Sequence, residues 1–151
     1  MNDIEYRILI KYLLEWGDIL KDCVFCNIIS KNLKSNIIHE NKGAIVIMSD
    51  NPEVEGHMLV FAKKHFPTLE LADQSSWYYI GEILNELGKR LKSQGYDGYN
   101  LLSANGVAAG QSVKHFHFHV IPRKKNDGIN AWPNFETKPN NTSDFFEKVK
   151  F

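Results

Sequence analysis

Three histidines alternate with apolar residues in the stretch "VKHFHFHVIPR", residues 113–123. His115, His117 and His119 occupy every second position, and a phenylalanine or a valine follows each of them. A period of two is the period of a β-strand, whose successive side chains point to opposite faces. Phenylalanine, valine and isoleucine also favour strands over helices. The stretch therefore predicts a strand with an apolar face packed on the core and three imidazoles on its other face.

Four further strands and one long helix are predicted along the rest of the chain. Short apolar stretches bounded by turn residues predict strands at residues 36–40, 44–48, 57–62 and 98–104. Apolar residues at helical spacing, followed by Gly95, predict a helix over residues 75–95. Strands grouped around one long helix are typical of the α+β class, which is the fold class that we predict.

The first residues form a separate feature of the sequence. Residues 3–16 place apolar side chains on one helical stripe, which predicts an amphipathic helix. Its polar face is mixed in charge rather than rich in lysine and arginine, so a membrane anchor is disfavoured. We interpret residues 1–20 as an extension of one domain over residues 21–151, which has its core at residues 23–124 and ends in a C-terminal tail.

The overall composition disfavours several classes of partner. Lysine and arginine total 18, as do aspartate and glutamate, so the formal net charge is zero. Binding to a nucleic acid usually needs a basic face, so a nucleic-acid partner is not expected. The first residues do not resemble a secretory signal, and no apolar run approaches the roughly 20 residues of a membrane-spanning helix. We therefore expect a soluble, cytoplasmic protein without a membrane partner.

Cys23 and Cys26 are the only cysteines of the chain, and they have the spacing "CVFC". This spacing is found in thioredoxin-like redox pairs, and it also supplies half of a zinc site. A disulfide is disfavoured in a reducing cytoplasm. The zinc interpretation needs two further ligands, which histidines of this chain can supply. The sequence leaves the redox alternative open.

The stretch "ANGVAAGQSVK", residues 104–114, leads directly into the histidine run. Its glycines permit backbone conformations that other residues avoid, and a turn that exposes N–H groups binds anions. Gln111 and Ser112 add side-chain donors. Beside three histidines, this stretch predicts a phosphate-binding rim.

Three blocks of the sequence, "CVFCNII", "NPEVEGHMLVFAKKH" and "NGVAAGQSVKHFHFHVIPR", together resemble the histidine triad (HIT) family of nucleotidyl hydrolases and transferases. They occur in the order and at the spacing of that family over residues 23–124. The histidine stretch is similar to that of Fhit-like members. The cysteine pair is similar to that of zinc-bearing prokaryotic members.

The resemblance implies a fold, an assembly and an activity. The fold is a HIT-like α+β domain with a five-stranded antiparallel sheet, and the assembly is a homodimer. The implied activity is cleavage at the α-phosphate of purine nucleoside phosphoramidates or dinucleoside polyphosphates, so the expected ligand is an AMP-type nucleotide. The implied mechanism forms a covalent nucleotidyl-histidine, which water then resolves.

The resemblance also implies roles for individual residues. His117 matches the nucleophile, and a neutral imidazole is well suited to that role. His119 matches a residue that donates to the phosphate oxygens. The other implied sites are His57 and Gln111 at the catalytic centre, Gly110, Gln111, Ser112 and His119 as nucleotide contacts, and Cys23, Cys26, His65 and His115 as ligands of a structural zinc ion.

Two nucleotide-binding positions depart from the family pattern. Ser49 stands where relatives often have a ribose-binding aspartate or asparagine, and Asp50 is its neighbour. Ala104 stands where an asparagine or a glutamine is frequent, and Asn105 is its neighbour. A one-residue slip turns a strand side chain to the other face, so Asp50 and Asn105 replace the missing groups only where a bulge or turn redirects them. Ser49, Asp50 and Asn105 are nevertheless the nucleotide contacts expected here.

The alternative function is a nucleotide-binding sensor or interaction module whose catalysis is incidental. The same histidines and the same pocket would serve it, so the sequence does not decide between the two. Tight AMP binding with negligible turnover would identify the sensor.

Overall fold

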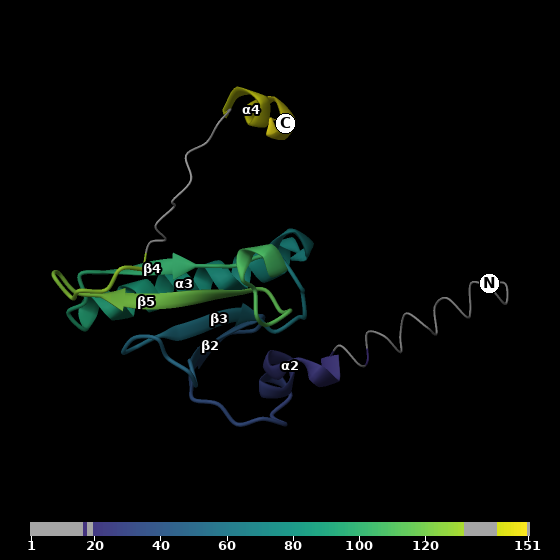
Figure 1. Ribbon diagram of the computed structural model, residues 1–151. Coiled ribbons are helices and arrows are strands. Elements are labelled where there is room, and N and C mark those ends of the chain that lie inside the picture. Colours follow the sequence, from purple (N-terminus) through teal and green to yellow (C-terminus); the bar gives the residue numbers. More distant parts are fainter. Residues whose placement is uncertain (1–16, 18–19, 132–141, 151) are drawn as a thin grey trace.

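The computed structural model describes residues 17, 20–131 and 142–150. A five-stranded antiparallel sheet in the order β1-β2-β3-β5-β4 forms its centre (Figure 1). The strands are β1 (Ile37–Glu40), β2 (Ala44–Met48), β3 (Met58–Ala62), β4 (Gly98–Leu102) and β5 (His117–Arg123). The predicted α+β fold with five antiparallel strands and one long helix is confirmed.

Besides this sheet, the described residues include three α-helices and two short 3₁₀ turns. The α-helices are α2 (Val24–Ile29), α3 (Gln74–Ser93) and α4 (Thr142–Val149), and short 3₁₀ turns are η1 (Leu69–Leu71) and η2 (Val107–Ala109). The helix predicted at residues 75–95 corresponds to α3. The amphipathic helix predicted at residues 3–16 lies outside the described residues. Within the described part of the chain, no helix is both long enough and apolar enough to span a membrane.

The long helix α3 covers one face of the sheet (Figure 1). Asp73 caps its N-terminus, because the carboxylate Oδ1 accepts a hydrogen bond from the backbone N–H of Ser76 at 2.8 Å. The apolar residues of α3 recur every three or four positions, which places them on one side of the helix. This packing joins Ile80, Ile83, Leu87 and Leu91 of α3 to strand residues such as Val46, Val60 and Val120.

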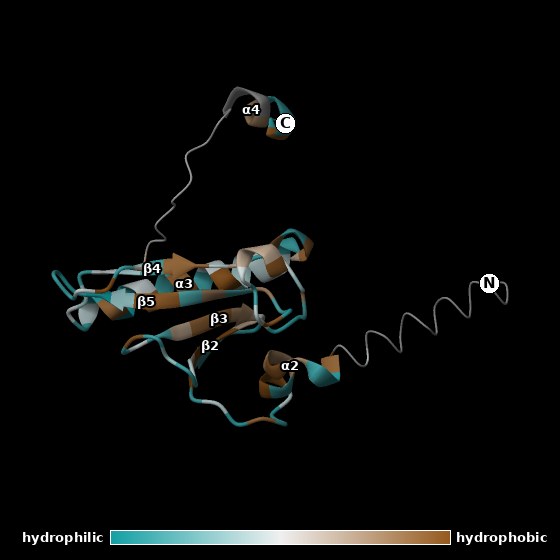
Figure 2. Cartoon of the chain, viewed as in Figure 1, coloured by the Kyte–Doolittle hydropathy of each residue, from teal (hydrophilic) through white to brown (hydrophobic). Residues whose placement is uncertain are grey.

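The opposite face of the sheet packs on α2. Phe25 and Ile28 of α2 are each only 4% exposed, and they pack on Ile45, Ile47 and Phe61 of the strands. Because strand side chains alternate between faces, β2 and β3 contribute to both apolar layers and are hydrophobic along their whole length (Figure 2). The short helix α2 is therefore a structural layer of its own.

The register of β5 decides which way the histidines point. His117 is opposite Phe61, and His119 is opposite Leu59, in the pairing of β3 with β5. Both histidines therefore lie on the α2 face, while the phenylalanines that alternate with them pack under α3. The regular strand begins at His117, so His115 lies just before it. The predicted alternation is confirmed, and α2 covers the histidine face at its beginning.

Candidate active site and metal centre

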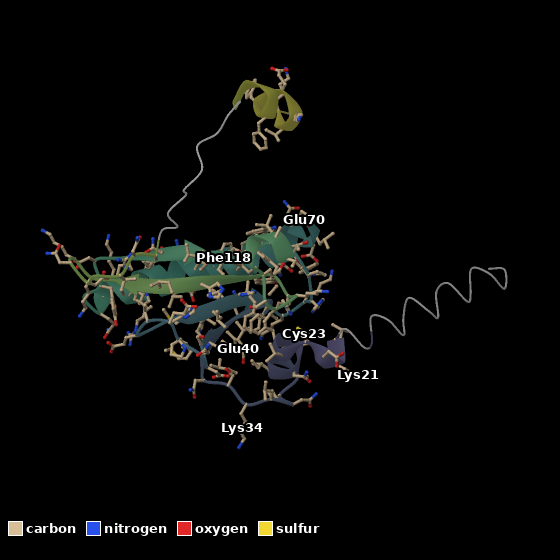
Figure 3. The ribbon with its side chains drawn as sticks, in the orientation of Figure 1. Lys21, Cys23, Lys34, Glu40, Glu70 and Phe118 are labelled. Carbon is tan, nitrogen blue, oxygen red and sulfur yellow. The ribbon has the colours of Figure 1, made fainter. Side chains whose placement is uncertain are left out.

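Four predicted metal ligands come together at the start of α2, where Figure 3 labels Cys23. Cys23 is the N-cap of α2, Cys26 lies in its first turn, His65 follows β3, and His115 precedes β5. One potential ligand atom of each residue lies within 4.8 Å of the others. The fold therefore brings together three segments that are distant in sequence.

The geometry of this cluster fits a tetrahedral zinc ion. The Nδ1 of His115 lies 3.4 Å from the Sγ of Cys23 and 3.7 Å from the Sγ of Cys26. The Nδ1 of His65 lies 3.3 Å from the Sγ of Cys26. Zinc bond lengths of about 2.0–2.1 Å to nitrogen and about 2.3 Å to sulfur place such atoms about 3.6 Å apart in a tetrahedron. The Nε2 of His115 donates to the carbonyl of Ala62 at 2.9 Å, which leaves the lone pair on Nδ1, facing the sulfur atoms.

The thiol of Cys26 lies beside that of Cys23 in a partly buried position. Burial, together with the adjacent Cys23 thiol, raises the pKa of Cys26 to about 12. A reactive cysteine needs the opposite shift, because the thiolate is the nucleophile. A bound cation stabilises thiolates in a buried site and displaces their protons. The cluster therefore fits a closed metal site of two cysteines and two histidines.

A second histidine cluster lies on the same face of the sheet. The ring centroids of His117 and His119 are 4.9 Å apart, and the Nε2 of His57 lies 2.8 Å from the Nδ1 of His119. His57 directly precedes β3 and is 5% exposed, and His117 is 4% exposed. The structure therefore brings together the three histidines that were predicted to form the catalytic centre.

A backbone carbonyl assigns the tautomer of His117. Its Nδ1 lies 2.7 Å from the carbonyl oxygen of His115. Because a carbonyl only accepts hydrogen bonds, Nδ1 carries the proton, and the lone pair of the neutral ring lies on Nε2. The hydroxyl of Ser103 donates to the carbonyl of His117 at 2.9 Å and holds the backbone at this point. His117 thus presents an unprotonated Nε2.

A chain of two hydrogen bonds assigns the tautomers of His57 and His119. The backbone N–H of Glu53 donates to the Nδ1 of His57 at 3.3 Å, so the proton of a neutral His57 lies on Nε2. That proton is donated to the Nδ1 of His119, and the proton of His119 therefore lies on its Nε2. The cluster has an acceptor in His117 Nε2 and a donor in His119 Nε2.

Burial keeps these three histidines neutral. Desolvation is the largest cause that lowers the pKa of His57, of His117 and of His119 below the ordinary histidine value. For His119 the neighbouring rings of His117 and His57 lower it further, to about 4. The assigned tautomers apply to neutral imidazoles, which is the form that these three rings take near neutral pH.

The side chain of Gln111 is bonded to the loop that precedes the histidines. Its Oε1 accepts the N–H of Gly106 at 2.8 Å, and its amide nitrogen donates to the carbonyls of Pro67 at 2.6 Å and Val113 at 2.9 Å. Both amide hydrogens and the amide oxygen are thus engaged with the backbone. Gln111 shapes this loop, and its direct contact with a phosphate stays a prediction.

The other residues of the predicted rim also help to shape the loop. The Oδ1 of Asn105 accepts the backbone N–H of Leu69 in η1 at 2.8 Å, which joins the loop to that turn. Gly110 ends η2 with a φ of 83°, a left-handed conformation that favours glycine. Ser112 lines a surface hollow together with Cys23 and His65 of the metal cluster. The rim therefore adjoins both histidine clusters through the segment 111–117.

Ser49 and Asp50 lie at the end of β2, beside the start of β3. The backbone N–H of Ser49 donates to the carbonyl of His57 at 3.0 Å, so the fold places Ser49 next to a histidine of the second cluster. Ser49 is half-buried, whereas Asp50 is exposed. The position agrees with a nucleotide contact near this cluster, and the contact itself stays a prediction.

Three residues of the site were missed by sequence reasoning. Phe25 packs on the ring of His117, the backbone N–H of Glu53 assigns the tautomer of His57, and the carbonyl of Ala62 assigns that of His115. Phe25 carried a usable signal, because it lies between the two cysteines. Glu53 and Ala62 act through the backbone, which is the same in every residue, so no side-chain pattern could reveal them.

The fold, the histidine pair on β5 and the adjoining glycine loop define the family. The HIT domain family profile matches residues 30–126, and the chain belongs to the HIT domain family. This confirms the resemblance that the sequence blocks indicated.

Proteins with named activities are among the relatives. An adenylylsulfatase of Arabidopsis thaliana is 36% identical over 115 residues, which are 76% of this chain and 58% of that protein. An adenosine 5'-monophosphoramidase of Schizosaccharomyces pombe is 31% identical over 130 residues, which are 84% of this chain and 95% of that protein.

A solved structure shares both the fold and the family. A zinc-bound histidine triad family protein from Mycobacterium smegmatis matches with a TM-score of 0.69 and 27% identity, over 76% of this chain and 84% of that one. Its description as zinc-bound belongs to that protein. It supports the zinc proposal made below for the cluster at α2.

Proposed function

We propose that this protein is a nucleotide hydrolase that cleaves the α-phosphate bond of adenosine phosphoramidates or related substrates through a covalent nucleotidyl-histidine. Adenylyl sulfates and dinucleoside polyphosphates are the related substrates. The named activities of the two relatives support this choice, because both act on an adenosine 5'-phosphate group joined to a leaving group. The choice of adenine as the base, and of an AMP-type nucleotide as the product, rests on the names of those relatives.

One observation carries the proposal. The hydrogen bond from His117 Nδ1 to the His115 carbonyl directs the lone pair of Nε2 away from the backbone, where it is the nucleophile of a neutral imidazole. The next residue on the same face, His119, holds a proton on Nε2. An acceptor nitrogen beside a donor nitrogen is the arrangement that attack on a phosphate needs.

The two chemical steps follow from this arrangement. In the first step the Nε2 lone pair of His117 forms a bond to the α-phosphorus, and the bond to the leaving group breaks with its electron pair. The leaving group takes a proton from solvent, while His119 Nε2–H donates to a non-bridging oxygen. In the second step a water oxygen attacks the phosphorus, its proton passes to solvent, and the bond to His117 breaks to release the nucleoside monophosphate.

The remaining polar residues are proposed as nucleotide contacts. Ser49 and Asp50 lie beside His57 and are suited to the ribose, because hydroxyl and carboxylate groups bind ribose hydroxyls. The hydroxyl of Ser112 is suited to a phosphate oxygen, whereas the backbone N–H groups of Gly110 and Gln111 donate to carbonyls within the loop. Gln111 and Asn105 support this loop from within through their backbone contacts.

The metal proposed for the cluster at the start of α2 is zinc. Cys23, Cys26, His65 and His115 would hold it, and all four ligands come from the protein. A closed four-ligand site supplies folding stability rather than a reactive position. The chain's own histidines therefore do the chemistry.

A homodimer in the cytoplasm completes the proposal. β4 is an edge strand, and Tyr99 and Leu101 remain 41% and 40% exposed on its α3 face. Among the described residues no strand pairs with the outer edge of β4, and such an edge with apolar side chains favours pairing with a second copy. The expected reducing compartment agrees with the two unpaired cysteines.

AMP release tests the proposed activity. Purified protein is incubated with an adenosine phosphoramidate and, separately, with a diadenosine polyphosphate, beside a His117→Asn variant and a His39→Asn control. His39 lies on β1 and pairs with Glu86 at the surface, so its replacement leaves the site intact. We expect AMP release and an acid-trapped nucleotidyl adduct in the protein and the control, and neither in His117→Asn. If the unmodified protein and both variants released no AMP from either substrate, although AMP itself bound, the sensor function would replace the hydrolase.

A further inference from the structure

Phe25 lies in the middle of the metal-binding loop and against the proposed nucleophile. Its ring centroid is 5.1 Å from that of His117 at an interplanar angle of 75°, and 5.6 Å from that of His115 at 73°. On its other side the ring stacks on Phe61 at 4.1 Å. Phe25 is 4% exposed and Phe61 is 0% exposed, so neither ring has room to move.

Two contacts of the His117 ring come from the metal ligands or from the loop between the two cysteines. Its Nδ1 is bonded to the backbone carbonyl of His115, whose own ring faces the cysteine sulfur atoms. The His117 ring also makes an edge-to-face contact with the ring of Phe25, which lies between Cys23 and Cys26 in the sequence. A change in the cluster therefore reaches His117 by two routes.

We infer that Phe25 positions His117 for attack, and that the Cys23–Cys26 loop with its metal holds Phe25 in place. This inference rests on the proposed role of His117 as the nucleophile. The side chain of His117 has two free torsions, and its carbonyl partner fixes one ring nitrogen but leaves the ring able to tilt about that bond. Edge-to-face contact with Phe25 removes the tilt. The metal cluster thus contributes to catalysis through packing, although it touches no substrate.

A purely structural role for Phe25 makes a different prediction. A core residue that only adds stability lowers the amount of folded enzyme but leaves the kcat of the folded fraction unchanged. A positioning residue lowers kcat and leaves KM unchanged, because the contact acts on the reacting geometry. Ile28 provides the matched control, since it is equally buried in the same cluster and has no ring to place against a histidine.

The first test compares Phe25→Leu with Ile28→Ala in metal-loaded protein, with the metal content and the folded fraction measured for each. We expect Phe25→Leu to lower kcat roughly tenfold to a hundredfold, with KM within about twofold. We expect Ile28→Ala to keep kcat within about twofold, whatever its stability. Equal effects of the two variants on kcat would overturn the inference.

The second test needs no turnover. The ring-nitrogen NMR signals of His117 report its tautomer and its number of orientations in isotope-labelled protein. We expect one set of signals with the proton on Nδ1 in metal-loaded protein, and shifted or multiple signals after chelation and in Phe25→Leu. Unchanged signals in both cases would overturn the inference. If no form of the protein releases AMP, the proposed function is wrong, but this result does not bear on the role of Phe25. The NMR signals then still show whether Phe25 positions the His117 ring.

Discussion

The Nε2 of His57 donates to the Nδ1 of His119 across 2.8 Å, and this bond connects the start of β3 to the middle of β5. The contact exists because Met58 pairs with Val120 in the sheet, which places the residue before β3 near His119. It carries the tautomer assignment from the backbone N–H of Glu53 to the proposed phosphate donor. The backbone N–H of Glu53, which is not on β5, therefore determines which ring nitrogen of His119 carries the proton.

The His57–His119 pair predicts a loss of stability in mild acid. Burial holds the pKa of His119 at about 4 and lowers the pKa of His57, whereas both titrate near 6.5 in the unfolded chain. The unfolded chain therefore binds more protons between about pH 6.5 and about pH 4, so the free energy of unfolding falls as the pH falls through this range. Urea unfolding at several pH values measures this slope.

The His119→Asn variant isolates this effect, because the amide oxygen replaces Nδ1 as the acceptor for His57 without titrating. We expect the variant to lose about 1 kcal/mol less stability than the original protein between about pH 7 and about pH 5. This figure allows for solvent screening of a half-buried group. Equal losses in the two proteins would show that this histidine does not carry the effect.

Replacing Gln111 is expected to lower the free energy of unfolding, which the loss of a phosphate contact alone would not explain. Gln111→Ala removes three hydrogen bonds to the backbone of Gly106, Pro67 and Val113, which should lower the free energy of unfolding by about 2–3 kcal/mol. Gln111→Glu keeps the acceptor for Gly106 but places a carboxylate against two carbonyls. We therefore expect the near-isosteric variant to be destabilised as much as Gln111→Ala. A Gln111→Glu protein with unchanged urea stability, but weaker AMP binding, would assign the residue to the ligand instead.

The sequence predicted the parts of the site that depend on side-chain type and local period. Alternation along residues 115–119 indicated a strand, and the register then placed His117 and His119 together on one face. The cysteines could be assigned to metal only through the resemblance, because their partners His65 and His115 are distant in the chain. Gln111 was predicted as a ligand contact, since no local pattern shows that its amide closes a loop onto Pro67. Contacts made by backbone atoms leave no trace in residue identity.

The metal cluster predicts that one zinc ion per chain stabilises the fold. Chelation, or Cys26→Ser, should lower the free energy of unfolding by several kcal/mol, because metal binding to a site formed only on folding contributes directly to folding. Elemental analysis and thermal unfolding with and without chelator measure both quantities. His39→Gln is the control, since this histidine lies at the surface outside the cluster. Metal-free protein with a titratable pair of thiols would favour the redox interpretation.

The exposed edge of β4 predicts the assembly. Leu101 is 40% exposed on this strand, and a lysine there would place a charge in any interface that forms along it. We expect Leu101→Lys to convert a dimer to a monomer at micromolar concentration, as measured by light scattering during size-exclusion chromatography. Ile38→Lys is the matched control, because Ile38 is 44% exposed on β1, at the opposite edge of the sheet.

The comparison of the two edges is what makes this prediction specific. Both variants exchange a partly exposed aliphatic side chain for lysine on an edge strand, so their effects on solubility and strand propensity are similar. A dimer that survives Leu101→Lys but dissociates in Ile38→Lys would move the interface to β1. A monomeric unmodified protein would exclude the homodimer. Dissociation in Leu101→Lys alone would place the second copy along β4, next to the loop 103–112 that leads from β4 toward His117 and His119.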